Sequence, residues 1–111
     1  MAEFVFLYRG GTRSDSAAES DKQMQKWMTW MQGLDKAGHL KDRGQPLEQT
    51  GKVVRGAQKV VTDGPFPESK DLVGGFSLVT AKTIDEAAEL SKGCPIFDVG
   101  GLVEIRPVME M

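Results

Sequence analysis

Residues 3–9 read EFVFLYR, a run of aromatic and β-branched residues that stops at the glycine pair 10–11. This composition before a glycine breaker predicts a β-strand. Successive side chains of a strand point to opposite faces of the sheet, so Val5 and Leu7 lie opposite an aromatic set. That set is Phe4, Phe6 and Tyr8. Since both sides of the strand are apolar, we expect both faces of the sheet to be covered.

Working outward from this strand, the next regular element is a long helix. We expect Ser20 to cap a helix that extends to Lys36 and that Gly38 ends. Apolar residues recur at three- and four-residue steps along it: Met24, Trp27, Met28, Met31 and Leu34. This spacing predicts a core face rather than a pliable methionine-rich groove, with Trp30 beside the stripe at a seam.

A second helix is predicted over residues 83–92, where Thr83 is the N-cap and Glu86 holds the capping-box position. Its inner side is apolar and consists of Ile84, Ala87, Ala88 and Leu90. Gly93 follows as a stop signal. In the sequence, the two predicted helices therefore precede and follow the central segment of the chain.

The remaining strands give the order of the fold. Residues 52–55 and 58–62 predict two short strand segments about Gly56, and further strands are expected over 75–81 and 99–108. With the hairpin counted as one split strand, the order is strand, helix, strand, strand, helix, strand. This order predicts a ferredoxin-like α+β fold, a four-stranded antiparallel sheet with two helices on one face. We expect the other face to meet the sheet of a second copy, in a homodimer.

Composition narrows the class of protein. The 111 residues carry 14 Lys and Arg against 16 Asp and Glu, a net charge of −2 with the two signs mixed along the chain. We therefore expect a single domain over residues 1–111, with no nucleic-acid partner and no membrane association. One cysteine, Cys94, allows no internal disulfide and fits no zinc motif, so we expect a cytoplasmic protein with no metal and no cofactor.

The stretch TDGPFPESKDLVGGF, residues 62–76, is either a turn or the floor of a site. As a turn, Asp63 accepts backbone N–H bonds, Gly64 permits positive φ, and the later glycine pair 74–75 admits a bulge or a close backbone approach. Pro65 would fix its own φ, and Phe66 would close the end of a barrel. As a site, the loop rims a cleft and Asp63 points inward beside free N–H groups.

Several stretches of this chain resemble the DGPF branch of the YCII-related family. The similar segments are DGPFPESKD (63–71) with GGF (74–76), YRGG (8–11), QKWMTWMQGL (25–34), EAAELSKGCP (86–95) and VEIRPV (103–108). The resemblance covers nearly the whole chain and implies the dimeric α+β barrel fold. It also implies a module without assigned activity, non-catalytic or binding a small organic acid. A regulatory protein partner, such as a sigma factor, is a further implication.

The same resemblance raises an enzyme alternative. A few YCII relatives, including a dehydrochlorinase, use a His/Asp pair, and a carboxylate can fix the tautomer and raise the basicity of an imidazole. Here Asp63 matches the carboxylate position, while the predicted first helix lacks the histidine and only His39 follows it. A lyase, dehydrochlorinase or isomerase would need these two side chains together. The tentative ligand-binding residues are Asp63, Gly64, Pro65, Phe66 and Arg106.

The arginines on or beside strands leave two readings open. Arg9, Arg55 and Arg106 are either edge residues in surface ion pairs or, for Arg9 and Arg106, a clamp for a carboxylate in the cleft. The pattern favours surface ion pairs.

Overall fold

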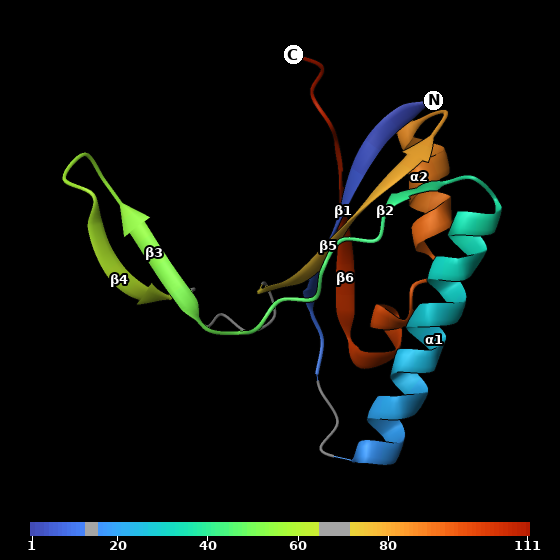
Figure 1. The fold of residues 1–111 in the computed structure, drawn as a ribbon, viewed down its shortest axis with the longest axis horizontal. Helices are drawn as coiled ribbons and strands as arrows, with labels where there is room; N and C mark the ends of the chain where they lie inside the picture. Colours follow the sequence, from blue (N-terminus) through green and yellow to red (C-terminus); the bar gives the residue numbers. More distant parts are fainter. Residues whose placement is uncertain (13–15, 65–71) are drawn as a thin grey trace.

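The computed structural model describes residues 1–12, 16–64 and 72–111, and its main feature is a four-stranded antiparallel sheet. Its strands are β1 (Ala2–Gly10), β2 (Leu40–Asp42), β5 (Val73–Ala81) and β6 (Gly101–Pro107). They lie in the order β2-β5-β1-β6, while α1 (Ala17–Lys36) and α2 (Ile84–Ser91) cover one face (Figure 1). This is the ferredoxin-like α+β fold predicted from the sequence.

β1 organises the sheet, as its alternating sequence predicts. It pairs antiparallel with both β5 and β6, with Phe6 opposite Ser77 and Ile105. Its aromatic set is buried beneath the helices, where Phe6 stacks on Trp30 and Tyr8 meets Trp27 edge-to-face. The core of the chain therefore lies between the sheet and the helices.

The second strand of the fold is not the one expected. The hairpin of β3 (Gly51–Arg55) and β4 (Val60–Gly64) forms as predicted, with Val54 opposite Val61, but it makes a separate two-stranded sheet. The place beside β5 is taken by β2, only three residues long. The prediction that the hairpin joins the main sheet was wrong. The sequence of β2 is too short to show the alternation of apolar and polar residues that predicts a strand, so β2 was not expected.

α1 begins four residues earlier than predicted. Its N-cap is Ser16, whose side chain accepts a hydrogen bond from the Glu19 N–H, so the assignment of Ser20 as the cap was wrong. Only Met31 and Leu34 of α1 are buried, whereas Met24 is 60% exposed and Met28 is 46% exposed. The N-terminal half of α1, which includes Met24, extends past the end of the sheet (Figure 1), so the predicted core face does not form there.

α2 confirms its predicted cap, since Thr83 Oγ1 accepts from the Glu86 N–H at 3.1 Å. The Glu86 carboxylate accepts from the Lys82 N–H at 2.9 Å, one residue before the cap. Ala87 is buried as expected, but Ile84 at the start of α2 is exposed. A 3₁₀ helix, η2 (Pro95–Val99), which the sequence did not predict, follows and leads into β6.

The glycines of the quoted motif serve a close backbone approach. The register between β1 and β5 shifts at this point, because Tyr8 pairs with Gly75 and the next residue pairs with Val73. Pro46 forms an isolated bridge with Gly75, and a Cβ there would lie 3.1 Å from the carbonyl oxygen of Gln45. The predicted bulge and close approach are both confirmed.

Among the described residues, no helix is long and apolar enough to span a membrane.

Candidate functional site

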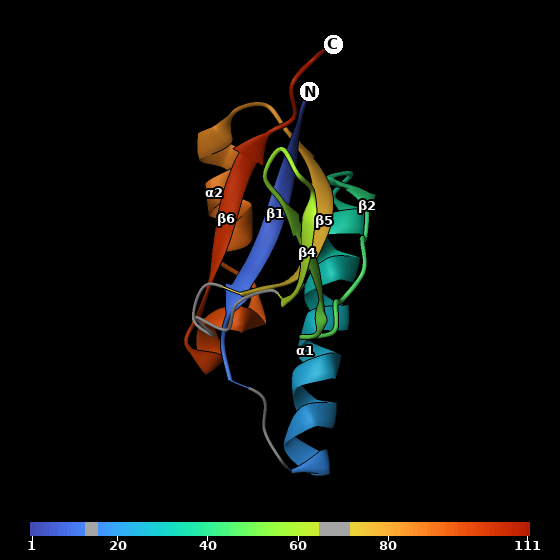
Figure 2. The ribbon, with the colours of Figure 1, turned by 90° about the vertical axis from the view of Figure 1, so that its left-hand side faces the viewer.

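The sheet face that the helices leave bare is the first candidate for a site. Figure 2 views the sheet from this side, with α1 and α2 behind it. The register places side chains from three strands on this open face: Glu3, Val5, Leu7 and Arg9 of β1, Phe76, Leu78 and Thr80 of β5, and Leu102, Glu104 and Arg106 of β6. We call this set the open face.

The centre of the open face is apolar. Leu7 lies opposite Phe76, and Val5 lies opposite Leu78. All four side chains are half-buried, while their neighbours on the helix side, such as Phe6, are fully buried. The two-sided apolar pattern of β1 is therefore present in the structure, and among the described residues neither helix covers its second side (Figure 2).

A cluster of charges borders this centre on β6. Arg9 Nε lies 2.7 Å from Glu104 Oε1, and Arg106 Nε lies 4.0 Å from Glu104 Oε2. Two guanidinium groups thus lie beside one carboxylate at the edge of the apolar centre, Arg9 closer to it than Arg106. Arginine presents a planar fork of donors that matches a carboxylate, so this cluster can receive a second carboxylate from a ligand.

The sequence pointed to Arg106 but missed Glu104. Residues 102, 104 and 106 alternate as Leu, Glu and Arg, which indicates that they share one face of a strand. Only the pairing of β6 with β1 reveals that this face also carries Arg9. The opposite margin carries another ion pair, between Lys41 of β2 and Glu3 of β1.

Asp63 lies away from the four-stranded sheet, on β4 of the hairpin. Its side chain is 89% exposed and pairs with Lys52 across the two strands at 2.5 Å. Gly64 ends the same strand. The other two predicted motif residues, Pro65 and Phe66, lie outside the described residues.

His39 lies at the turn between α1 and β2 and is held against β5. Its Nδ1 is 2.7 Å from the carbonyl oxygen of Thr80, and the Thr80 N–H donates to the His39 carbonyl at 2.7 Å. Because a carbonyl oxygen can only accept, Nδ1 carries the proton in this contact. His39 is thus paired with Thr80 and Asp63 with Lys52, so one chain does not bring His39 and Asp63 together.

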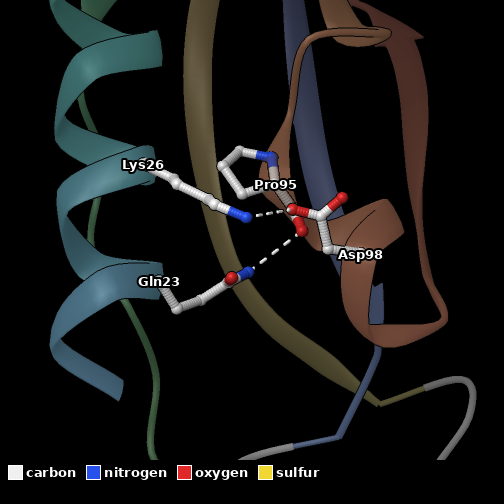
Figure 3. Close-up of polar contacts among 4 residues, drawn as sticks. All are labelled: Gln23, Lys26, Pro95 and Asp98. Carbon is white, nitrogen blue, oxygen red and sulfur yellow. Dashed lines mark hydrogen bonds and ion pairs between the residues drawn. The ribbon is translucent and has the colours of Figure 1, made fainter. Parts of the chain in front are cut away.

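A groove lies on the helix side of the molecule, where α1 faces the segment from α2 to η2. It is an open groove of about 700 Å³ with Lys26, Trp30, Cys94 and Asp98 among its lining residues. Figure 3 shows two side chains of α1 directed at η2: Gln23 Nε2 donates to the Pro95 carbonyl at 2.9 Å, and Lys26 Nζ lies 3.2 Å from Asp98 Oδ2. These contacts tie the helix layer together.

Two buried groups of this layer have raised pKa values. Burial raises the pKa of Cys94 to about 12, which keeps the thiol protonated and unreactive near neutral pH. Burial also raises the pKa of Tyr8, whose hydroxyl donates to Ser77 Oγ at 2.9 Å. Ser77 in turn donates to the Arg43 carbonyl at 2.8 Å. Both groups are satisfied core residues, and in the part of the chain that is described no cluster of His, Cys, Asp and Glu could hold a metal ion.

Comparison with known proteins places the chain in a family. The solved structure of 5-chloro-2-hydroxyhydroquinone dehydrochlorinase (TftG) from Burkholderia phenoliruptrix AC1100, in complex with 2,5-dihydroxybenzoquinone, is similar at 15% identity and a TM-score of 0.49. The match covers 98% of this chain and 95% of that one. A comparison with curated proteins found no match. The family model of the YCII-related domain matches residues 4–111, and the chain therefore belongs to the YCII-related family.

Proposed function

We propose that this YCII-related protein is a homodimer that binds a small organic acid between its sheets, as a ligand-binding rather than a catalytic module. The observation that carries the proposal is the open face, where an apolar centre lies next to the cluster of Arg9, Glu104 and Arg106. Binding sites for small molecules combine apolar walls with a few polar groups in this way.

The apolar centre supports the dimer. Half-exposed side chains from β1 and β5 gain stability when a second sheet covers them, at roughly 25 cal/mol for each Å² of apolar surface removed from water. A twofold pairing would bring two open faces together, and each copy would supply its own arginine cluster at the border. The ligand would lie in the space between the sheets.

The charge cluster supports an acid as the ligand. Arg106 Nε lies 4.0 Å from Glu104, and the planar fork of donors of an arginine matches the carboxylate of a ligand. Arg106 has a side chain 69% exposed and lies farther from Glu104 than Arg9 does, which makes it the freer of the two to turn toward a ligand. We assign Arg106 the direct contact and Arg9 the support of Glu104.

The contacts favour binding over catalysis. A proton-transfer pair would need His39 and Asp63 within about 3 Å or one water apart. Each instead pairs with another residue, Thr80 and Lys52 respectively. A regulatory role with a protein partner is compatible with a ligand-controlled dimer, because a ligand that binds between subunits changes the stability of the pair.

An NMR titration tests the proposal. The amide spectrum of the protein would be recorded against small carboxylic and hydroxy acids at neutral pH. We expect saturable shifts on β1 and β6, and at least about a tenfold loss of affinity in Arg106→Gln, which corresponds to roughly 1.4 kcal/mol. The matched control is Lys36→Gln, which removes one positive charge from the last turn of α1. Equal affinities in both variants, or no shifts across the set of acids, would contradict the proposal.

A further inference from the structure

The β3–β4 hairpin has no partner sheet within the described residues, although it exposes apolar side chains. Val54, Val60 and Val61 are 62%, 55% and 59% exposed. An isolated two-stranded hairpin is marginally stable in water at best. Its strands therefore gain stability only when another surface covers them.

Residues 44–47, which lead into the hairpin and which we call its root, are bound to β5 of the main sheet. Pro46 forms a bridge with Gly75, and the Leu47 N–H donates to the Gly74 carbonyl at 2.8 Å. A Cβ on Gly44 would lie 1.7 Å from the Phe76 carbonyl oxygen, so the backbone passes against β5 at this point. From this root the hairpin extends away from the sheet on the side of the open face (Figures 1 and 2).

The chain is less compact than a globular monomer of its mass. The chain exposes 8029 Å², whereas a compact monomer of its mass exposes roughly 6,000 Å². Its radius of gyration is 15.5 Å, against about 13 Å for a compact chain of this length. An extended chain of this kind has surface for a partner to cover, and a standard interface needs roughly 800 Å² from each partner.

The chemistry of the hairpin matches that of the open face. Opposed residues of the hairpin share a side, so the pair of Val54 and Val61 lies next to the pair of Lys52 and Asp63. One side of the hairpin therefore presents an apolar pair bordered by an ion pair. The open face likewise presents an apolar centre between two ion pairs, Glu3 with Lys41 and Arg9 with Glu104.

We infer that the β3–β4 hairpin is an arm that packs on a second copy of this chain, where Val54 and Val61 cover part of the apolar centre of that copy's open face and the facing sheet covers the rest. The inference rests on the proposed homodimer, and it adds that each copy contributes residues to the ligand cleft of the other. Asp63 and Lys52, which are remote from the sheet of their own chain, are placed at the mouth of the partner's ligand cleft. Each cleft is then incomplete without the other copy.

A mixed-label NMR experiment tests the arm directly. Equal amounts of ¹³C-labelled and unlabelled protein would be unfolded together and refolded, and an isotope-filtered NOESY would record only contacts between copies. We expect contacts from the methyl groups of Val54 and Val61 to those of Val5, Leu7 and Leu78. A spectrum of the dimer with no contact between copies from the Val54 and Val61 methyl groups would overturn the inference.

A pair of variants gives a second, independent readout. Val54→Asp with Val61→Asp places two charges in the proposed contact, and we expect the dimer dissociation constant to rise at least about 100-fold. The control is Met24→Asp, an equally exposed apolar residue on α1, which is expected to leave dimerisation unchanged. Circular dichroism checks that each variant keeps its fold.

The outcomes separate the arm from the proposed function. A stable dimer with an unchanged dissociation constant in the double variant, and no contacts between copies from the hairpin, would overturn the arm and leave the dimeric binding module in place. A monomer at every concentration tested would overturn both. A weakened dimer together with contacts between copies supports the arm.

Discussion

The two faces of the main sheet carry similarly apolar side chains but differ in how deeply these side chains are buried. On the helix side, Phe6 is fully buried and stacks on Trp30. On the other side, Leu7 is an equally apolar residue that remains half-exposed beside Phe76. The same alternating strand thus supplies the core of one chain and, on our account, half of an interface. A two-sided apolar strand in a protein with helices for only one face indicates a partner rather than a larger core.

The largest effect is expected from neighbouring substitutions on the two faces. Phe6→Ala should lower the free energy of unfolding by about 3–5 kcal/mol, because it opens a cavity in the core. Leu7→Ala should act mainly on dimerisation, so its cost should appear as a weaker dimer. Urea unfolding at two protein concentrations, with sedimentation for the dimer, measures both. A Leu7→Ala protein that dimerises like the wild type would contradict the assignment of Leu7 to the dimer interface.

The root of the hairpin offers a sharper version of the comparison. Gly44 and Gly56 have φ of +69° and +79°, but a Cβ would collide with the Phe76 carbonyl only at Gly44. Gly56→Ala should cost about 1–2 kcal/mol for its left-handed backbone. Gly44→Ala should cost more than this and should also weaken the dimer, because the backbone at the root must move. Equal losses of thermal stability in both variants would show that the close approach is unimportant.

The covered face also predicts sensitivity to alkaline pH. The folded state keeps Cys94 and Tyr8 protonated beyond their ordinary pKa values of 9.0 and 10.0. The unfolded chain loses these protons first, so the stability is fully present below about pH 9 and falls as the pH rises toward 12, by at most about 1.4 kcal/mol per unit for each group. Denaturant titrations from pH 7 to 11 measure the slope. Tyr8→Phe and Cys94→Ala should each reduce it, and an unchanged slope in both would contradict this origin.

The smallest effect on stability is expected at Asp63. Its ion pair with Lys52 is largely exposed, and such pairs contribute about 0–1 kcal/mol. Asp63→Asn should therefore leave the melting temperature nearly unchanged, while it changes the affinity for the acid by removing a charge from the mouth of the partner's cleft, if the hairpin reaches that cleft. Calorimetry with the acid found by NMR measures the binding, and Asp85→Asn on α2 is the control. A large loss of thermal stability with normal binding would assign Asp63 to turn structure alone.

The sequence predicted the fold class because strong local patterns carried it. The alternation in residues 3–9, the cap at Thr83 and the glycines at 74–75 all have local physical causes. The start of α1 was missed because Ser16 and Ser20 are each followed three residues later by Glu or Gln, so both match a capping box. Only the structure selects between them.

The site was predicted less well because it depends on register and on contacts across the sheet. β2 has three residues and no alternation, so the hairpin was mistaken for the second strand. Glu104 became a candidate only when the pairing of β1 with β6 placed it beside Arg9. The position of Asp63 on a projecting hairpin likewise could not be inferred from its motif, which indicates a turn but not where the turn lies.

Sedimentation equilibrium of the wild-type protein and of Leu7→Asp, across the micromolar range, tests whether a second copy covers the open face. We expect a mass near twice the 12.1 kDa of one chain for the wild type and a folded monomer for the variant. A wild-type mass of 12.1 kDa at all concentrations would contradict this expectation.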